Sequence, residues 1–153
     1  MKEIKYFLAK SEPNSYSFED LECDIVTWWD GVRNYQAILV IKSWKIGDRI
    51  FFYRSVQNPA IIGMMEVVTS PIFDVNDERK ISWKAQVKLI TKFEQEVPLQ
   101  LIKESQKFNS YILVRNSRLS TMACPQDFVD FVFYHANYKE EMGHTKKLKT
   151  QFK

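Results

Sequence analysis

Cysteine and histidine are scarce in this 153-residue chain, which contains two of each. Cys23 and Cys124 lie far apart and form no Cys-x-x-Cys pair, and His135 and His144 do not complete a set of metal ligands. These absences argue against a disulfide scaffold and against a zinc site. We therefore expect no metal and no other cofactor, and a reducing compartment, which is the cytoplasm or, in a eukaryote, the nucleus.

Long apolar runs are also missing. No stretch of 18 apolar residues is present, which argues against a transmembrane helix. The apolar run near the N-terminus, Tyr6–Ala9, has only four residues and is too short for a signal peptide. Residues 1–138 contain no repeat and no internal linker, and the chain is 45% hydrophobic, so we expect one folded domain there.

Excess charge is absent from this domain. The chain has 22 basic and 19 acidic residues; residues 139–153 hold five Lys and two Glu, which leaves 17 of each sign in residues 1–138. A neutral domain is poorly suited to bind duplex nucleic acid mainly by neutralising phosphates. Residues 139–153 are predicted to be a basic C-terminal tail, and any specific binding is expected from a local site in the domain.

What the sequence does contain is apolar periodicity. Alternation and short apolar runs predict strands at residues 5–10, 49–55, 60–68, 82–93 and within 110–120. Helical spacing and capping residues predict helices at 17–23, capped by Ser17, and at 34–44, 97–105 and 124–137. The irregular order of these elements favours an α+β fold, a small, curled, mostly antiparallel sheet or partial barrel with packed helices.

Three polar clusters stand at the ends of these apolar elements. Lys10, Ser11 and Glu12 follow the first strand, and the next residue, a proline, extends the backbone so that Lys10 and Glu12 project to one side. The second cluster is "WDGVRNYQ", residues 29–36, and the third is "LVRNSRLS", residues 113–120. Binding sites are commonly built where regular elements end, so the three clusters together favour a binding site.

Each cluster also has an ordinary explanation. Lys10 and Glu12 can form a weak exposed ion pair, and Asp30 and Asn34 can serve turn geometry. The arginines of the third cluster can neutralise neighbouring carboxylates, and Tyr53 can be an ordinary strand aromatic. The co-occurrence of the clusters, rather than any one of them, supports the binding interpretation.

Five segments resemble the EVE domain family in their order and spacing: "KSEP", "WDGVRNYQA", "GDRIFFYRS", "GMMEV" and "LVRNSRLS". The resemblance runs from Tyr6 to Val132. It implies a PUA-like pseudo-barrel, similar to PUA and YTH domains. It also implies binding of DNA or RNA, with a pocket for a modified base, notably modified cytosine in DNA.

The resemblance gives the clusters expected roles. Trp29 matches the family's tryptophan and is the expected stacking platform, while Trp28 is expected in the core. Glu12 is the expected acceptor for a cytosine amino group. Base-edge contacts are expected from Asn34, Gln36 and Ser55, phosphate contacts from Arg33, Arg115 and Arg118, and further contacts from Lys10, Ser11, Tyr35, Tyr53 and Ser117.

Two positions depart from the family pattern. Arg54 stands where many members have histidine, which weakens the case for a histidine acid or base and suggests a contact to phosphate. Residues 38–40, Ile-Leu-Val, replace an Arg-Asn-Asn run and remove polar groups from a helix.

We expect a monomeric, non-catalytic protein whose partner is nucleic acid with a modified base, without metal or membrane. One alternative is a hydrolase of acylated cytidine, because small ASCH proteins, distant PUA-like relatives, place a lysine and a carboxylate beside a small pocket; Lys10 would then be the base. Another alternative is a protein-interaction module that uses Trp28 and Tyr35.

The basic tail generates the first testable prediction. Deleting residues 144–153 removes four of its five lysines, so the slope of log affinity against log salt should become shallower. Preference for a modified base should stay unchanged, because phosphate contacts position nucleic acid without reading it. Titrations at several salt concentrations measure both quantities, and a lost base preference would instead place the tail in the site.

Overall fold

The computed structural model describes residues 3–139, so the predicted tail lies outside the described residues except for Lys139. The strands are β1 (Tyr6–Ser11), β2 (Val26–Trp29), β3 (Arg49–Arg54), β4 (Ala60–Val67), β5 (Ile72–Phe73), β6 (Trp83–Pro98) and β7 (Thr121–Ala123). The helices are α1 (Phe18–Asp24), α2 (Tyr35–Lys42), α3 (Leu99–Glu104), α4 (Ile112–Arg115) and α5 (Gln126–Ala136). In the described part of the chain, none of these helices is long and apolar enough to span a bilayer.

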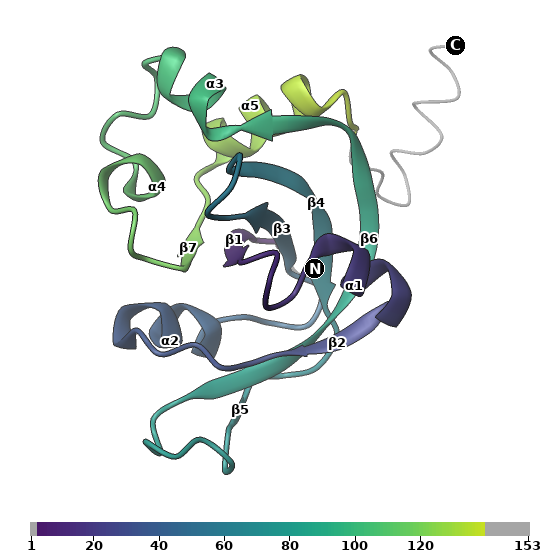
Figure 1. Cartoon of the computed structure of the whole chain (residues 1–153), viewed down its shortest axis with the longest axis vertical. Coiled ribbons are helices and arrows are strands. Elements are labelled where there is room, and N and C mark those ends of the chain that lie inside the picture. Colours follow the sequence, from purple (N-terminus) through teal and green to yellow (C-terminus); the bar gives the residue numbers. More distant parts are fainter. Residues whose placement is uncertain (1–2, 140–153) are drawn as a thin grey trace.

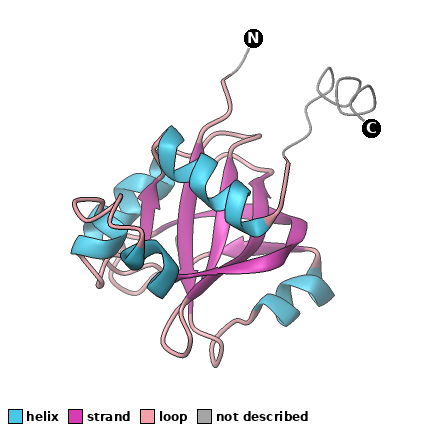
Figure 2. Cartoon of the chain, turned by 90° about the horizontal axis from the view of Figure 1, so that it is seen from above, coloured by secondary structure: helices cyan, strands magenta, loops and turns pink. Residues whose placement is uncertain are grey.

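The strands form one curled sheet with helices around it (Figures 1 and 2). The strand order is β2-β6-β4-β3-β1-β7, and β5 pairs with one end of β6. Among the strand pairs of residues 3–139, only β1 and β3 run parallel; the other pairs are antiparallel. The sheet is therefore mostly antiparallel, and the predicted α+β fold with a small curled sheet is confirmed.

The long strand β6 gives the sheet its curl. It has 16 residues and pairs with β4 along one side and with β2 near its beginning. The β4–β6 register shifts twice, between Ile61 and Gly63 and between Met64 and Met65. Such irregularities bend a strand and increase its twist, so one continuous strand can reach around the core.

The centre of the fold is β4, which is buried on both faces except at Glu66. This burial confirms the prediction from its unbroken apolar run. Gly63 is the point of closest approach: a Cβ atom built there would lie 2.4 Å from the Thr91 carbonyl oxygen and 2.8 Å from the Phe18 ring. Helix α1 therefore packs against β4 at a position that admits only glycine.

Helix α1 begins where the sequence predicts. The Ser17 hydroxyl accepts from the Asp20 N–H at 3.1 Å, and the Asp20 carboxylate accepts from the Ser17 N–H at 2.9 Å. This reciprocal capping box satisfies two N–H groups that the helix cannot pair itself. The cap fixes the helix start, and Phe18 and Leu21 are then buried in the core.

The prediction of a strand within residues 110–120 is wrong. Residues 112–115 form the short helix α4, and the strand of this region, β7, begins only at Thr121. A run of three apolar residues, Ile112–Val114, does not distinguish helix from strand by periodicity. The strands β2 and β5 were not predicted, because each is short and exposed on at least one side and pairing with β6 defines it.

Gly63 allows a direct test of the packing between α1 and β4. We expect Gly63→Ala to lower the free energy of unfolding by about 1–3 kcal/mol, because the new methyl group meets backbone and an aromatic ring. Urea denaturation measures the change. Gly31→Ala is the comparison, since nothing lies within 4 Å of its added methyl group and only its φ of +73° is unfavourable. A smaller loss for Gly63→Ala than for Gly31→Ala would contradict this packing.

Candidate functional site

An open cavity of about 780 Å³ lies between the end of β1, strand β2 and the loop before β7. Since β2 and β7 are the two edges of the sheet, we call this region the seam. The cavity volume is typical of a ligand site. It is lined by Lys10, Ser11, Glu12, Ser15, Tyr16, Thr27, Trp28, Trp29, Asp30, Gly31, Val32, Arg33, Asn34, Arg118 and Ser120.

The first polar cluster forms one wall of this cavity. The Lys10 ammonium donates to the Ser117 carbonyl at 3.0 Å and lies 5.6 Å from the centre of the Tyr53 ring. Burial lowers the pKa of Lys10. The backbone carbonyl of Glu12 accepts from the N–H groups of Ser15 and Tyr16, both at 2.9 Å, which makes a tight turn.

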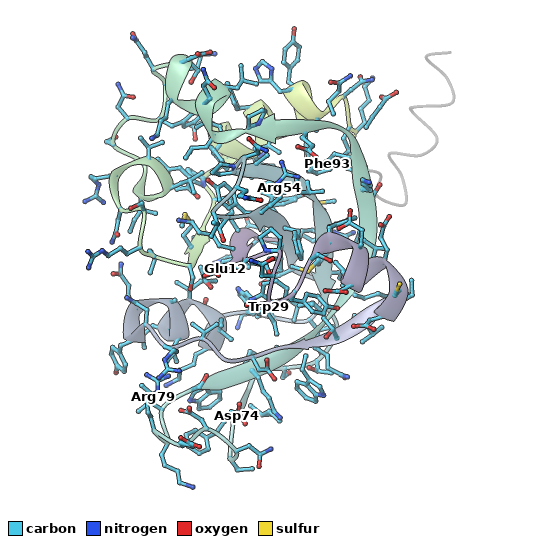
Figure 3. All side chains as sticks on the ribbon, viewed as in Figure 1. Glu12, Trp29, Arg54, Asp74, Arg79 and Phe93 are labelled. Carbon is cyan, nitrogen blue, oxygen red and sulfur yellow. The ribbon has the colours of Figure 1, made fainter. Side chains whose placement is uncertain are left out.

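The side chain of Glu12 is exposed on this turn. Among residues 3–139 its carboxylate has neither an ion-pair nor a hydrogen-bond partner. The expected alternative, an ion pair with Lys10, is therefore not formed. Glu12 and Trp29 both line the cavity, and the acceptor capacity of the Glu12 carboxylate is unused; both residues are labelled in Figure 3.

The two adjacent tryptophans face opposite sides of β2. Trp29 is 8% exposed, and its ring makes edge contacts with Phe52 and Tyr16 at centroid distances of 5.8 and 6.4 Å. Trp28 is 38% exposed, and the Lys84 ammonium lies 4.6 Å from its ring centre. The prediction that Trp28 belongs to the core is wrong, because alternation along β2 places Trp29 there.

Contacts from distant residues hold the turn at residues 30–34. The buried Ser82 hydroxyl donates to the Val32 carbonyl at 3.0 Å, and the Arg79 guanidinium donates to the Arg33 carbonyl at 3.1 Å. The Asn34 side chain accepts from the Ala37 N–H at 3.1 Å and caps α2. The turn is thus fixed from the β5–β6 loop on one side and from α2 on the other, and Figure 3 shows Arg79 in that loop.

The third polar cluster contributes less to the cavity than predicted. Arg118 and Ser120 line it, whereas Arg115 donates through Nε to the Ser110 carbonyl at 3.2 Å. The Asn116 side chain accepts from the Arg118 N–H at 3.1 Å and shapes the loop. In the described chain, the guanidinium groups of Arg33 and Arg118 make no ion pair.

The structure brings seven of the thirteen predicted site residues together at the cavity. These are Lys10, Ser11, Glu12, Trp29, Arg33, Asn34 and Arg118. The other six, which do not line it, are Tyr35, Gln36, Tyr53, Ser55, Arg115 and Ser117. Tyr53 is 3% exposed, burial raises its pKa to about 12, and its ring contacts the Lys10 ammonium.

The Arg54 guanidinium is engaged within the protein. Its guanidinium binds both carboxylate oxygens of Glu96, at 2.8 and 3.1 Å. It also donates to the carbonyls of Gln57 and Asn58. With its donors used inside the protein, Arg54 fixes the β3–β4 turn, and the suggested phosphate contact is wrong.

Sequence reasoning missed the cavity residues Tyr16 and Trp28, and also Ser82, which holds the turn at residues 30–34 through the Val32 carbonyl. Tyr16 donates to the Asp24 carboxylate at 2.8 Å, and burial is the first cause that raises its pKa to about 12. A strand at residues 26–29 would have implied that one tryptophan faces outward. For Ser82, whose partner is 50 residues away, no signal was present in the sequence.

A second hollow of about 950 Å³ lies at the other end of β1. Its buried carboxylate, Asp48, already accepts from the backbone N–H groups of Lys5 and Lys45. None of the predicted site residues lines this hollow, so its size does not make it the better candidate. Residues 3–139 contain no group of three or more metal-ligating side chains.

A curled, mostly antiparallel sheet with helices around it and a cavity at its seam defines a small α+β domain. The YTH domain of Zygosaccharomyces rouxii MRB1 shares this fold, with a TM-score of 0.57 at 14% identity over 93% of this chain and 92% of that one. The chain belongs to the EVE domain family, which it matches over residues 5–139. The family predicted from the five segments is confirmed.

Curated proteins of similar sequence include thymocyte nuclear protein 1 from several vertebrates. Human thymocyte nuclear protein 1 is 29% identical over 161 residues, which cover 83% of this chain and 72% of that protein. The rat protein of that name is 43% identical over 75 residues, which cover 41% of this chain and 33% of that protein. The chain thus spans only a third of the rat relative in that match.

Solved structures are similar over nearly the whole domain. A protein from Agrobacterium tumefaciens has a TM-score of 0.81 at 29% identity, covering 90% of this chain and 96% of that one. The human THYN1 protein, in complex with 5-methylcytosine containing DNA, has a TM-score of 0.79 at 26% identity. That match covers 89% of this chain and 99% of that one.

The two tryptophans generate different expectations for the size of the stability loss on substitution. Trp29→Ala should lower the free energy of unfolding by about 3–5 kcal/mol, because it empties a buried aromatic site. Trp28→Ala removes a half-exposed ring and one cation–π contact, so it should cost about 0.5–1 kcal/mol. Chemical denaturation of both variants beside the parent protein measures the difference. Equal losses would contradict the alternation of the two rings.

Proposed function

We propose that this chain binds DNA that carries modified cytosine, and that the modified base leaves its stack to enter the cavity at the seam. One observation carries the proposal: the unpaired Glu12 carboxylate lies at the same cavity as the Trp29 ring. The likeness to a human protein solved with 5-methylcytosine containing DNA supports DNA and cytosine as the substrate class.

Trp29 supplies the flat surface in this proposal. Its ring is held by Phe52 and Tyr16, and its small exposed part borders the cavity. A base that stacks on an aromatic side chain gains about 1–3 kcal/mol, whatever its identity. Because the ring is fixed before binding, little conformational entropy is lost when the base arrives.

Glu12 supplies the base preference. An ionised carboxylate only accepts hydrogen bonds, so it pairs with the amino group of cytosine but not with the carbonyl of thymine or uracil. Lys10 stands on the same wall and has one of its N–H groups occupied by the Ser117 carbonyl. Its other N–H groups can donate to ring acceptors of the base.

Arg33 and Arg118 supply phosphate contacts. Both line the cavity, and within residues 3–139 neither guanidinium has an ion-pair partner. Phosphate contacts set the register of the strand without reading its sequence. Gln36, Ser55 and Arg115 do not line the cavity, and they remain proposed contacts to the nucleic acid outside it.

The modification itself contributes through apolar contact. Burial of one methyl group is worth about 0.8 kcal/mol, or about four-fold in affinity. Larger selectivity requires a polar group that the wrong base leaves unpaired. In this cavity the Glu12 carboxylate is that group. The identity of the base should therefore change the affinity more than the methyl group does.

A hydrolase of acylated cytidine is the second candidate function. The lowered pKa of Lys10 favours it, because a buried amine with a lowered pKa can act as a base. Release of acetate from N4-acetylcytidine by the purified protein would support this candidate. Binding without turnover would support a reader.

The proposal is tested first by a binding screen. Oligonucleotides of one sequence, as DNA and as RNA, with cytosine, 5-methylcytosine or thymine at one position, are titrated at one salt concentration. The expected order of affinity is 5-methylcytosine, cytosine, thymine, in DNA. A preference confined to RNA would correct the partner, and no dependence on the base would overturn the proposal.

Glu12→Gln tests the assigned reader. We expect the variant to fold normally, because the side chain is exposed and unpaired. The amide keeps the shape but adds a donor that accommodates a carbonyl, so the preference for cytosine over thymine should shrink by about ten-fold, which corresponds to one hydrogen bond to a charged group. Titrating both base types against parent and variant measures this ratio.

Glu22→Gln is the matched control, since Glu22 is an exposed glutamate on α1 that does not line the cavity. It changes the net charge equally and should leave the ratio unaltered. If Glu12→Gln lowers affinity for both bases by the same factor, Glu12 is not the base reader.

A further inference from the structure

The stacking surface of the cavity is recessed. Trp29 is only 8% exposed, and the turn at residues 30–34 and the Glu12 turn stand around it. A base inside a duplex cannot reach such a surface without leaving the stack. Under the proposed function, the duplex therefore keeps a gap where the base had been, and the neighbouring bases lose their stacking partner.

Proteins that unstack DNA commonly insert a side chain at the opened step. Three exposed apolar side chains are candidates near the cavity. Trp28 is 38% exposed, but the Lys84 ammonium lies over its ring. Val56 is 69% exposed, but it is small compared with a base and sits on a turn with a φ of 77°. Tyr35 is 67% exposed and large enough to cover a base.

The Tyr35 ring is not engaged elsewhere in the described part of the chain. No aromatic, hydrogen-bond or cation–π partner is present for it within residues 3–139. One turn further along α2, Leu39 is 46% exposed. Residues four apart lie on the same face of a helix, so Tyr35 and Leu39 form an apolar ridge that the protein itself does not cover.

The position of Tyr35 is also well fixed. It is the first residue of α2, and its neighbour Asn34 both lines the cavity and caps the helix through the Ala37 N–H. The opposite face of α2 is anchored in the core by Ala37, Ile38 and Ile41. Tyr35 is thus the exposed first residue of a helix that is anchored in the core, and it follows directly in sequence on a residue that lines the cavity.

We propose that Tyr35 is the side chain that enters a DNA duplex and fills the space left by the base in the cavity. This inference rests on the proposed function and assigns a separate step within it. Arg33, two residues before Tyr35, is free to hold a phosphate beside the opened step. Leu39, one helical turn after Tyr35, would make apolar contact with the neighbouring base.

The test separates insertion from contact with the base in the cavity. Tyr35→Ala is titrated with one oligonucleotide that carries 5-methylcytosine, once as a duplex and once as a single strand. A single strand has no intact stack to fill. We therefore expect the affinity for the duplex to fall by about ten-fold, the scale of one lost stacking contact, and the affinity for the single strand to stay unchanged.

A second readout follows the opened step directly. The fluorescence of 2-aminopurine placed next to the modified cytosine in the duplex rises when that base loses its stacking partner. In the complex with the parent protein, the Tyr35 ring stacks on the 2-aminopurine and should limit this rise in fluorescence. Tyr35→Ala lacks the ring and should therefore give a brighter signal at saturation. Tyr35→Phe retains the ring and should behave as the parent.

Tyr134→Ala is the matched control, because Tyr134 is 80% exposed on α5 and does not line the cavity. It should not alter either affinity. The insertion would be overturned if Tyr35→Ala lowered the affinity for duplex and single strand equally, or lowered neither. It would also be overturned if only Val56→Ala lowered the affinity for the duplex selectively. If the parent protein shows no preference for the modified base in either form, the proposed function fails as well.

Discussion

The register between β2 and β6 is the constraint on which the site depends. Trp29 pairs with Ala85 and Trp28 with Gln86. Because Ala85 is fully buried, its pairing partner Trp29 faces the core, and Trp28 must face outward. A slip of one residue would exchange the two rings and turn every side chain of β2 to the other side. The wall of the cavity would then be lost although the composition of the chain is the same.

The second requirement is that the turn after β2 stays in place. Its carbonyls at Val32 and Arg33 accept from Ser82 and Arg79, which lie in the loop before β6. That loop is organised by the Asp77 carboxylate, which accepts from the N–H groups of Ile81 and Ser82 at 2.9 Å each. These backbone hydrogen bonds lower the pKa of Asp77, so the arrangement is present at neutral pH. Strand β6 thus pairs with β2 before the turn, and the loop that precedes β6 holds the turn itself.

The domain carries no net charge, so what distinguishes the cavity is which of its charged side chains are left unpaired. Arg54 is paired with Glu96, and Lys84 lies near Asp74. At the cavity, Glu12 and the guanidinium of Arg33 have no ion-pair partner within residues 3–139. A neutral domain can therefore place an unpaired carboxylate and an unpaired cation at one cavity, which a uniformly basic surface could not do.

The sequence by itself determined the class of fold, the family and the chain segments of the site. An unbroken apolar run marks β4, apolar alternation marks β6, the capping box marks α1, and "WDGVRNYQA" marks the turn, because each of these signals is local. Only the tertiary structure decided that Trp29 rather than Trp28 faces the core, that Arg54 forms an ion pair with Glu96, and that residues 112–115 are helical. The physical reason is that an edge strand, an ion pair and a short apolar run depend on partners far away in the sequence. Composition and periodicity do not record those partners.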